Sequence, residues 1–466
     1  MRDLLESGQR LALLVRSSKK ESASLRVESI LQHWERESGK ILPRPVLLEG
    51  DIRKPFLGLN STDKKWVARH CSKLMHSAAS LTFHADGTGE PWHTNFDGTQ
   101  NMLELCRVTG LRELHYVSTA YVCGLRQGRI LETEVDCGQS FRNDYEQSKL
   151  KAEVSVRNSD FIDELTVYRP AVISGDSKTG YTNTYHGIYL YLRLMALLAP
   201  RQPVGPDGVR LTRLRLPLDG DERRNVIPVD WVSKVMTHLF HQPEAHGHTF
   251  NLAPDRCLTA RQLIDAGYSY FNSTGVEYVG YGAIDPATYN ELEAAALPGL
   301  EMYNNYDSTD PTFDCTNLKR FAADLPCPPI DEAMLHTYIQ YGEADRWGKR
   351  RMETPIVPWS AAEYFHEFPL INDGAKKTTR SKLAIDLVGP GGGQWTLAMM
   401  ADGNLTCTSG IHGDADSLLK LSAQEFRELV SNSDVPKHRQ AVEQLFPLSS
   451  DLSFKSLSPS IRERVF

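Results

Sequence analysis

The sequence predicts an α/β protein built on a doubly wound parallel sheet, followed by a small α+β domain. Over residues 1–340, short apolar runs alternate with amphipathic stretches, which is the pattern of strands and helices around a parallel sheet. Polar and small residues follow the ends of several of these runs, at the edge where such sheets bind their ligands. From Leu383 onward, apolar runs separated by Gly and Asp turns replace this pattern and indicate a hairpin meander.

Each expected strand of the first region is a short apolar run, and each expected helix has a capping residue or apolar residues at helical spacing. The expected strands are Leu11–Val15, Val46–Leu48, Lys73–Met75, Glu113–Val117 and Leu165–Tyr168. The expected helices are Ser22–Glu37, a helix capped by Ser61 and ending at His70, Thr94–Thr109 and the helix that carries Tyr145. From about 174 to 340 the alternation loosens, which fits a smaller lobe covering a substrate.

Residues 341–380 contain runs of Lys and Arg and are expected to form a linker, because such runs are usually solvated. A separate domain is expected over 381–466. It begins with the apolar run Ile385–Val388, passes through a Gly triplet to Trp395–Met399, turns at Ala401–Asn404 and continues as Leu405–Ser409. Ser422 is expected to cap the amphipathic helix that follows.

Composition limits the classes of function. With 466 residues the chain is expected to form two or three domains, and its net charge of −7 argues against general nucleic-acid binding. The eight cysteines are scattered, so reduced thiols and no metal site are expected. The longest apolar stretches, such as 190–200, are too short to span a bilayer, and the first residues lack the apolar core of a signal peptide. A cytoplasmic protein is therefore expected.

Three side chains form a candidate catalytic group. Tyr145 and Lys149 are four residues apart, which places them on one face of a helix, and Thr119 follows the strand Glu113–Val117. A lysine ammonium beside the phenol would favour its ionised form and lower its pKa. Tyr145 could then pass a proton to a carbonyl oxygen that the Thr119 hydroxyl holds in place. The group suits reduction of a carbonyl by a nicotinamide hydride.

Residues after the first strands suit a dinucleotide. Arg16 ends the first strand, where the adenosine ribose would lie, and an arginine there suits a 2′-phosphate. Asp51 follows the next strand and could reach the adenine edge. Ala78 and Ala79 are small residues at a position where the backbone must approach the cofactor closely. These positions predict NADPH as the cofactor.

Several motifs in order resemble the extended branch of the short-chain dehydrogenases/reductases, and within it the thioester-reductase and fatty-acyl-reductase type. The matching segments are Leu14–Arg16, Gly50–Ile52, His76–Ala79, Asn95–Thr99, Val117–Val122, Tyr145–Lys149, Tyr168–Asp176, Val226–Val232 and Phe250–Pro254. The resemblance covers roughly residues 1–270 and implies a Rossmann-type fold. It implies that Tyr145 is the catalytic acid, that Lys149 binds the ribose hydroxyls and that Thr119 binds the substrate carbonyl.

The resemblance also implies the cofactor-binding positions. They are Arg16, Asp51, Ile52, Ser77, Ala78, Ala79, Asn95, Pro170, Ala171, Val172 and Ile173, of which the last four would contact the nicotinamide end. The family opens with a strand and a Gly-x-x-Gly-x-x-Gly turn that holds the pyrophosphate, and this chain as given has neither. Residues Arg2–Gly8 look like the end of the helix that follows that turn. A start site placed too late, or a trimmed sequence, is the favoured explanation; true loss of the segment, with crippled dinucleotide binding, is the alternative.

In the C-terminal region, residues 383–446, a further resemblance rests on Trp395–Leu397, Asp402-Gly403, Asp414–Asp416, Leu419–Ser422 and Phe426. These segments resemble the sterol-carrier-protein fold, which implies a tunnel for acyl chains or sterols. The alternative is a small packing module without a ligand. The leading functional hypothesis is therefore an NADPH-dependent reductase of a lipid-like carbonyl or an acyl thioester, free or carrier-bound, whose C-terminal domain binds or presents lipid. A lipid-binding scaffold with a decayed reductase body is a second hypothesis. A dehydrogenase or epimerase of a sugar nucleotide or sterol is a third.

Overall fold

The computed structural model describes residues 1–18, 21–280, 282, 284–297, 309–350, 354–366, 379–401 and 405–431. By internal packing the chain divides into two units. The first unit combines Met1–Cys71 with Met352–Phe466, and the second unit is Ser72–Arg351. The eight cysteines are free, as the sequence predicts. Within the described residues, no helix is both long enough and apolar enough to cross a membrane.

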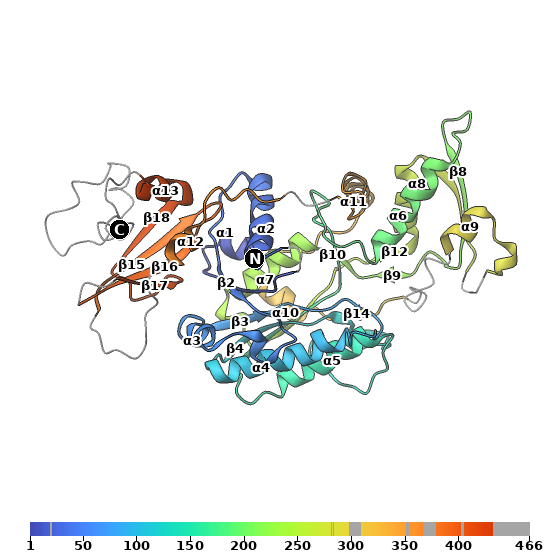
Figure 1. Ribbon diagram of the computed structural model, residues 1–466. Helices are drawn as coiled ribbons and strands as arrows, with labels where there is room; N and C mark the ends of the chain where they lie inside the picture. The colour runs from blue at the N-terminus through green and yellow to red at the C-terminus, as the bar shows by residue number, and fades with distance from the viewer. Residues whose placement is uncertain are drawn as a thin grey trace. The chain divides into compact units, whose positions relative to one another are not determined.

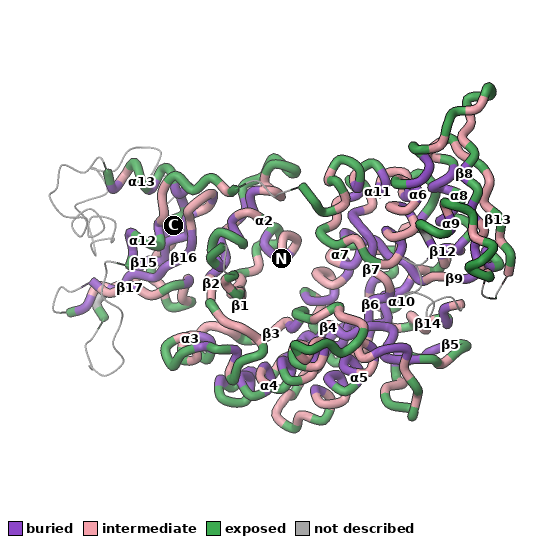
Figure 2. The backbone as a smooth tube through the Cα atoms, turned by 45° about the vertical axis from the view of Figure 1, so that its right-hand side comes forward, coloured by how far each residue is buried: buried purple, intermediate pink, exposed green. Residues whose placement is uncertain are grey.

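The second unit is built on a four-stranded parallel sheet in the order β11-β6-β4-β3 (Figure 1). The strands are β3 (Lys73–His76), β4 (Glu113–Val117), β6 (Glu164–Pro170) and β11 (Thr249–Leu252). Helices α4 (Gly98–Thr109) and α5 (Asp144–Arg157) lie together on one side of this sheet in Figure 1. Strand β6 is buried over most of its length (Figure 2), as expected for a strand covered on both faces.

The other face of this sheet packs on α7 (Val229–Phe240) and α10 (Thr316–Phe321). A single apolar cluster joins Trp231, Val235 and Leu239 of α7 to Tyr168 and Phe250 of the sheet. Helix α7 has a strongly one-sided apolar pattern, which accounts for its packing. The four-stranded sheet is therefore the middle layer of three, with helices on both of its faces.

The remainder of the second unit forms a lobe beside the sheet (Figure 1). Two apolar clusters hold it together, one between α6, α8 and α11 and one between α6, α8 and the strand pair β8–β13. Its helices are α6 (Ile188–Leu198), α8 (Ala260–Tyr270), α9 (Glu291–Ala296) and α11 (Glu332–Ala344). Its main strands are β8 (Arg210–Leu216) and β13 (Ser273–Tyr278). Short pairs complete the unit: β5 (Arg129–Ile130) with β14 (Thr312–Phe313), β7 (Val172–Ser174) with β10 (Val226–Pro228), and β9 (Arg223–Arg224) with β12 (Leu258–Thr259).

The first unit brings the two ends of the described chain together. Its N-terminal part contains α1 (Arg2–Glu6), the parallel pair β1 (Ala12–Val15) and β2 (Val46–Glu49), α2 (Ala23–Ser38) and α3 (Ser61–His70). The fully enclosed Arg44 guanidinium joins Glu28 and Glu35 of α2. Trp66 of α3 donates to the main-chain oxygen of Ser409 at 2.6 Å, and Gln32 of α2 donates to Ile356. Residues far apart in the sequence therefore share one body.

The C-terminal part of this unit is a sheet in the order β17-β16-β15-β18. Its strands are β15 (Thr379–Val388), β16 (Gly393–Met400), β17 (Leu405–Ser409) and β18 (Ser417–Ser422), with helices α12 (Ala361–His366) and α13 (Ala423–Ser431). Strands β15, β16 and β17 form an antiparallel meander, and β18 pairs parallel to β15. One face is covered by an aromatic cluster in which the rings of Phe365 and Trp395 lie 4.6 Å apart.

Most of the expected elements are present, and most of their ends differ by at most two residues. The helix expected from Thr94 begins as a short π-helix over His93–Asp97 and continues as α4 from Gly98, and β15 begins at Thr379 instead of Ile385. The strand expected at 165–168 begins at Glu164, and the meander is as predicted. Two details differ. Asn60, not Ser61, caps α3, because the Asn60 side chain accepts a hydrogen bond from the Asp63 amide. Strand β18 was not predicted from the sequence pattern. The expected turn at 401–404 lies largely outside the described residues, and so does most of the charged run ending at 380. The boundaries near 340 and 381 stay predictions.

Candidate active site

The carboxyl ends of three parallel strands place the predicted catalytic residues at one edge of the sheet. Strand β4 ends at Val117 and delivers Thr119, while β3 leads into Ser77 and β6 ends at Pro170. Helix α5 begins at this edge because the Asn143 side chain caps its first turn by accepting from the Glu146 amide at 3.0 Å. Tyr145 therefore stands in the first turn of α5.

Thr119 and Tyr145 lie close together. Burial raises the pKa of the Tyr145 phenol to about 12, and the neighbouring Thr119 hydroxyl, which favours the phenolate, only partly opposes this shift. Thr119 is itself buried, and its hydroxyl donates to the main-chain oxygen of Pro170 at 3.4 Å. The tyrosine is thus held protonated at neutral pH beside a hydroxyl that can share a substrate oxygen. This is the state that a general acid requires.

Lys149 lies one helical turn after Tyr145 and is 2% exposed. Its ammonium donates to the main-chain oxygen of Val117 at 2.8 Å and to the Tyr116 hydroxyl at 3.4 Å. Burial lowers the pKa of Lys149 to about 8, and the Glu153 carboxylate partly opposes this shift. We expected this lysine to lower the pKa of Tyr145. The phenol pKa is instead above its usual value, because burial dominates and the ammonium is directed at the Val117 carbonyl.

Two buried charged residues near Lys149 were not predicted from the sequence. Glu153 lies a further turn along α5 and accepts from the Arg169 guanidinium at 2.6 Å. Burial disfavours the charge of Glu153, but Arg169 outweighs it and lowers the pKa of the carboxyl. Spacing alone could have found Glu153, because residues 145, 149 and 153 repeat every four positions on one helix face. Nothing in the sequence indicates that Arg169, at the end of β6, would turn toward it.

The predicted cofactor residues of the second unit flank this group. Ser77, Ala78 and Ala79 follow β3 and are exposed, so a ligand could approach their backbone closely. Asn95 is buried and holds the next segment: its side-chain oxygen accepts from the Ser80 amide at 2.8 Å, and its amide group donates to the Ser148 hydroxyl on α5 at 3.1 Å. Asn95 therefore fixes α5 to the loop after β3.

The segment after β6 lies beside Thr119. Pro170 and Ala171 are buried, Val172 is partly exposed and the Ile173 side chain is 44% exposed. The contact between Pro170 and Thr119 brings this segment to the catalytic edge. Apolar residues next to the Tyr145 phenol and the Thr119 hydroxyl would suit the flat face of a nicotinamide ring.

Three further predicted cofactor residues, Arg16, Asp51 and Ile52, belong to the first unit. Arg16 follows β1, and Asp51 and Ile52 follow β2, so both segments lie at the carboxyl edge of this parallel pair. Arg53 donates to the Asp51 carboxylate at 2.8 Å and lowers the pKa of that carboxyl to about 2. The Arg16 guanidinium is 3.8 Å from the same carboxylate and is 57% exposed. Arg16 thus retains donors that can face a phosphate.

The residues of the second unit fit the nicotinamide and ribose end of a dinucleotide. They offer a protonated phenol, a hydroxyl, an ammonium for ribose oxygens and exposed small residues at one sheet edge. This set can hold a carbonyl next to a hydride donor and supply its proton. The three catalytic candidates come from a strand end and a helix start that the sheet brings together.

Comparison with known proteins gives the family of the chain. The family NAD_binding_4, described as male sterility protein, matches residues 1–236. The nonribosomal peptide synthetase asaC of Aspergillus flavus is 25% identical over 343 residues, which are 67% of this chain and 31% of that protein. The chain thus spans about a third of the length of this curated relative.

Solved structures share the fold. The terminal R domain of the myxalamid PKS-NRPS pathway has a TM-score of 0.58 at 22% identity, over 75% of this chain and 87% of that one. A thiolation-reductase di-domain from an archaeal non-ribosomal peptide synthetase has a TM-score of 0.55 at 17% identity, over 75% and 73%. These similarities confirm the predicted fold class. Since the family match covers more than half of the sequence, the chain belongs to the male sterility protein family of NAD-binding proteins and is an enzyme of the short-chain dehydrogenase/reductase class.

Proposed function

We propose that this chain is an NADPH-dependent reductase that acts on an acyl thioester held by a carrier. The proximity of Thr119 and Tyr145 beside Lys149 is the observation that carries the proposal. The names of two similar proteins, a nonribosomal peptide synthetase and a thiolation-reductase di-domain, support a thioester rather than a free sugar or sterol. A catalytic group this complete argues against a decayed scaffold.

In this mechanism the chain binds the acyl group and controls one proton. NADPH, when bound, supplies the hydride that reduces the thioester carbonyl carbon. Thr119 and Tyr145 donate hydrogen bonds to the carbonyl oxygen, and the phenol gives its proton as negative charge develops there. The carbon–sulfur bond then breaks, the carrier thiol leaves and an aldehyde remains. Lys149 would hold the ribose hydroxyls of the cofactor, and solvent would return the proton to the Tyr145 phenolate.

NADPH rather than NADH is proposed because Arg16 follows β1 with its guanidinium largely exposed. A 2′-phosphate would accept charge-assisted hydrogen bonds from this group. Asp51 would not repel the phosphate strongly, because the Arg53 guanidinium already neutralises the Asp51 carboxylate. The remaining cofactor positions, Ile52, Ser77–Ala79, Asn95 and Pro170–Ile173, are proposed on their place at strand ends.

The test is turnover of an acyl-pantetheine thioester by the full-length protein, followed by NADPH oxidation and by capture of the aldehyde. Tyr145→Phe removes the proton donor and is expected to lower kcat by about 10²–10⁴-fold, the usual contribution of a general acid. Thr119→Ala should lower kcat by about 10²-fold, and Thr119→Ser should restore most of it. Tyr289→Phe, in the segment before α9, is the matched control and should retain full activity. Equal activity of Tyr145→Phe and wild type would rule out the proposed acid.

For the C-terminal sheet we propose a lipid-binding role. Its support is a meander followed by a parallel strand and an amphipathic helix, together with a groove of about 730 Å³ that Ile41, Val388 and Leu421 help to line. Against it stands the filled aromatic cluster around Phe365, Trp395 and Phe426 on the sheet face, which fits a brace for the fold.

Melting of the full chain with and without long-chain acyl-CoA separates the two roles, because a ligand that binds the native state raises Tm. Ile41→Glu places a charge in the groove at an exposed position and should abolish a rise that depends on the groove. Thr406→Glu, on β17 and not among the residues that line the groove, adds the same single charge and should retain the rise. A Tm that does not change when acyl-CoA is added would mean that the sheet only supports the fold.

A further inference from the structure

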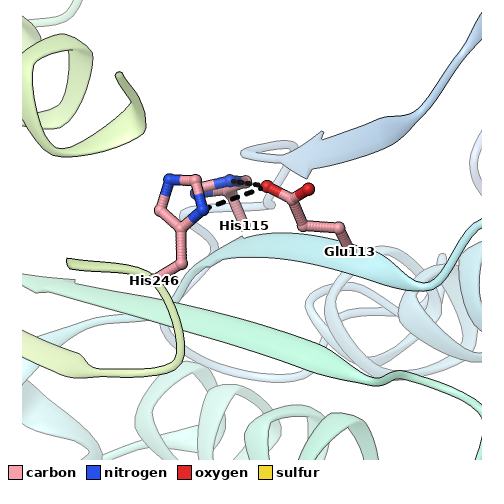
Figure 3. Close-up of side chains that lie close together, drawn as sticks. All are labelled: Glu113, His115 and His246. Atoms are coloured by element: carbon pink, nitrogen blue, oxygen red, sulfur yellow. Dashed lines mark hydrogen bonds and ion pairs between the residues drawn. The ribbon is translucent and has the colours of Figure 1, made fainter. Parts of the chain in front are cut away.

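At the amino end of β4, opposite the catalytic edge, three metal-binding side chains meet. Glu113 and His115 lie two residues apart on β4, and His246 precedes β11. One potential ligand atom from each residue lies within 4.8 Å of the other two (Figure 3). His115 and His246 are buried, and the Glu113 side chain is 22% exposed. The proposed reductase mechanism uses none of the three.

We propose that Glu113, His115 and His246 bind a divalent transition-metal ion, with Zn²⁺ as the best match. Two imidazoles and a carboxylate are a preferred ligand set for zinc. Zinc bonds of about 2.0–2.1 Å in a tetrahedral site place neighbouring ligand atoms about 3.3 Å apart. Glu113 Oε1 lies 3.2 Å from His115 Nε2 and 3.3 Å from His246 Nδ1. Two edges of the tetrahedron are therefore already formed.

The hydrogen bonds of the outer ring atoms orient both histidines for metal binding. His246 Nε2 lies 3.1 Å from the main-chain oxygen of Phe240, which can only accept, so the proton of the neutral ring is on Nε2. The lone pair on Nδ1 then faces the Glu113 oxygen. A lone pair directed at a carboxylate is repelled unless a proton or a cation lies between them. His115 Nδ1 is 3.0 Å from the Tyr168 hydroxyl, a partner that can fix its ring while Nε2 binds metal.

The fourth position has a protein candidate. The Glu164 carboxylate, at the start of β6, is 3.8 Å from His246 Nδ1 and 45% exposed. A water molecule could take this place instead. With Glu164 as the fourth ligand the ion would join β4, β6 and the segment entering β11, which are neighbours in the sheet; with water it would join β4 and that segment. The site would therefore stabilise the sheet from the edge remote from Thr119.

Lys73 competes for the same carboxylate. Its ammonium donates to Glu113 Oε1 at 2.7 Å, and its side chain is 28% exposed, so it can swing into solvent when an ion binds. This competition supplies a sharp test. Lys73→Gln removes one unit charge near the site without removing a ligand, and it should tighten zinc binding about tenfold.

The experiment is calorimetric titration of the metal-stripped full chain with Zn²⁺, repeated with Co²⁺ to record the absorption of the bound ion. One Zn²⁺ per chain is expected, with a tetrahedral cobalt spectrum and a Tm raised by about 3 °C in excess metal. His115→Gln and His246→Gln should each weaken binding by at least about a hundredfold, and Tyr168→Phe by about tenfold. His70→Gln is the matched control, since His70 and His412 are another close imidazole pair, and it should bind as wild type does.

Three outcomes would overturn the proposal. The first is no zinc uptake by the wild-type chain. The second is uptake that survives both His115→Gln and His246→Gln. The third is uptake that is lost in His70→Gln, which would locate the ion at the other pair. Because Lys73→Gln keeps every ligand, unchanged affinity in that folded variant also counts against the site, whatever happens to the histidine variants.

Discussion

The ammonium of Lys149 donates a 2.8 Å hydrogen bond to the main-chain oxygen of Val117, the last residue of β4. This bond ties the first turns of α5 to the strand that delivers Thr119. It also keeps a buried cation at the position where the proposed mechanism needs one. The neighbouring Glu153 favours that charge, but burial dominates.

The buried ammonium of Lys149 should lower the free energy of unfolding at neutral pH. Its pKa falls from about 10.4 in the unfolded chain to about 8 in the fold, so between these values the unfolded state binds more protons and native stability rises with pH. Below about pH 8 the full cost is present. Lys149→Met should therefore raise the free energy of unfolding by about 1–2 kcal/mol near pH 7, and by less near pH 9.5. Urea unfolding at both pH values measures this, and a variant less stable than wild type near pH 7 would contradict it.

In contrast to Lys149, the buried pair Glu153–Arg169 should stabilise the fold, so that removal of one of its charges lowers the free energy of unfolding. Both side chains are at most 1% exposed, so removal of one partner leaves a buried charge. Glu153→Leu is expected to destabilise the chain by about 3–5 kcal/mol, because it leaves the buried Arg169 guanidinium without its carboxylate, whereas Arg169→Met leaves Glu153 paired with Arg157 and should cost less. The double variant Glu153→Leu with Arg169→Met should recover most of the Glu153→Leu loss. A double variant as unstable as Glu153→Leu would mean that packing, and not the unpaired charge, sets the cost.

Arg16 should select between the two nicotinamide cofactors. Arg16→Ala is expected to raise KM for NADPH by about 10–100-fold, the value of one lost charge-assisted hydrogen bond, and to leave KM for NADH unchanged. Steady-state kinetics with both cofactors measures the difference. Arg36→Ala, on α2, is the control for loss of positive charge. Equal effects on both cofactors would assign Arg16 to the fold instead of the 2′-phosphate.

The stacked rings of His70 and His412 should make the first unit sensitive to acid. Their centroids are 4.0 Å apart, and burial, followed by the charge of His412, lowers the pKa of His70 to about 4. Burial also lowers the pKa of His412. Because the unfolded histidines titrate near 6.5, stability should fall as pH drops from about 6.5 toward 4. His412→Phe keeps an aromatic ring and should flatten the dependence of Tm on pH in this range. His241→Phe should not.

Local patterns were enough to predict much of the fold. Short apolar runs require burial in a parallel sheet, and side chains such as Asn143 satisfy helix amides locally, so β3, β4, β6 and α5 could be located from nearby residues. The four-residue spacing of Tyr145 and Lys149 likewise placed both side chains on one face of a helix. The position of Thr119 after β4 then placed it at the same edge, because the carboxyl ends of parallel strands coincide.

Only the tertiary structure decided which distant groups meet. The turn of Arg169 toward Glu153, the approach of His246 to Glu113 and the pairing of β18 with β15 each depend on how the strands are ordered in the sheets. The pKa of Tyr145 depended on tertiary packing as well. Spacing places a cation near the phenol, but only packing shows that the ammonium is bound to Val117 and that burial governs the titration. Sequence determines local pattern, whereas burial and long-range contact follow from the whole fold.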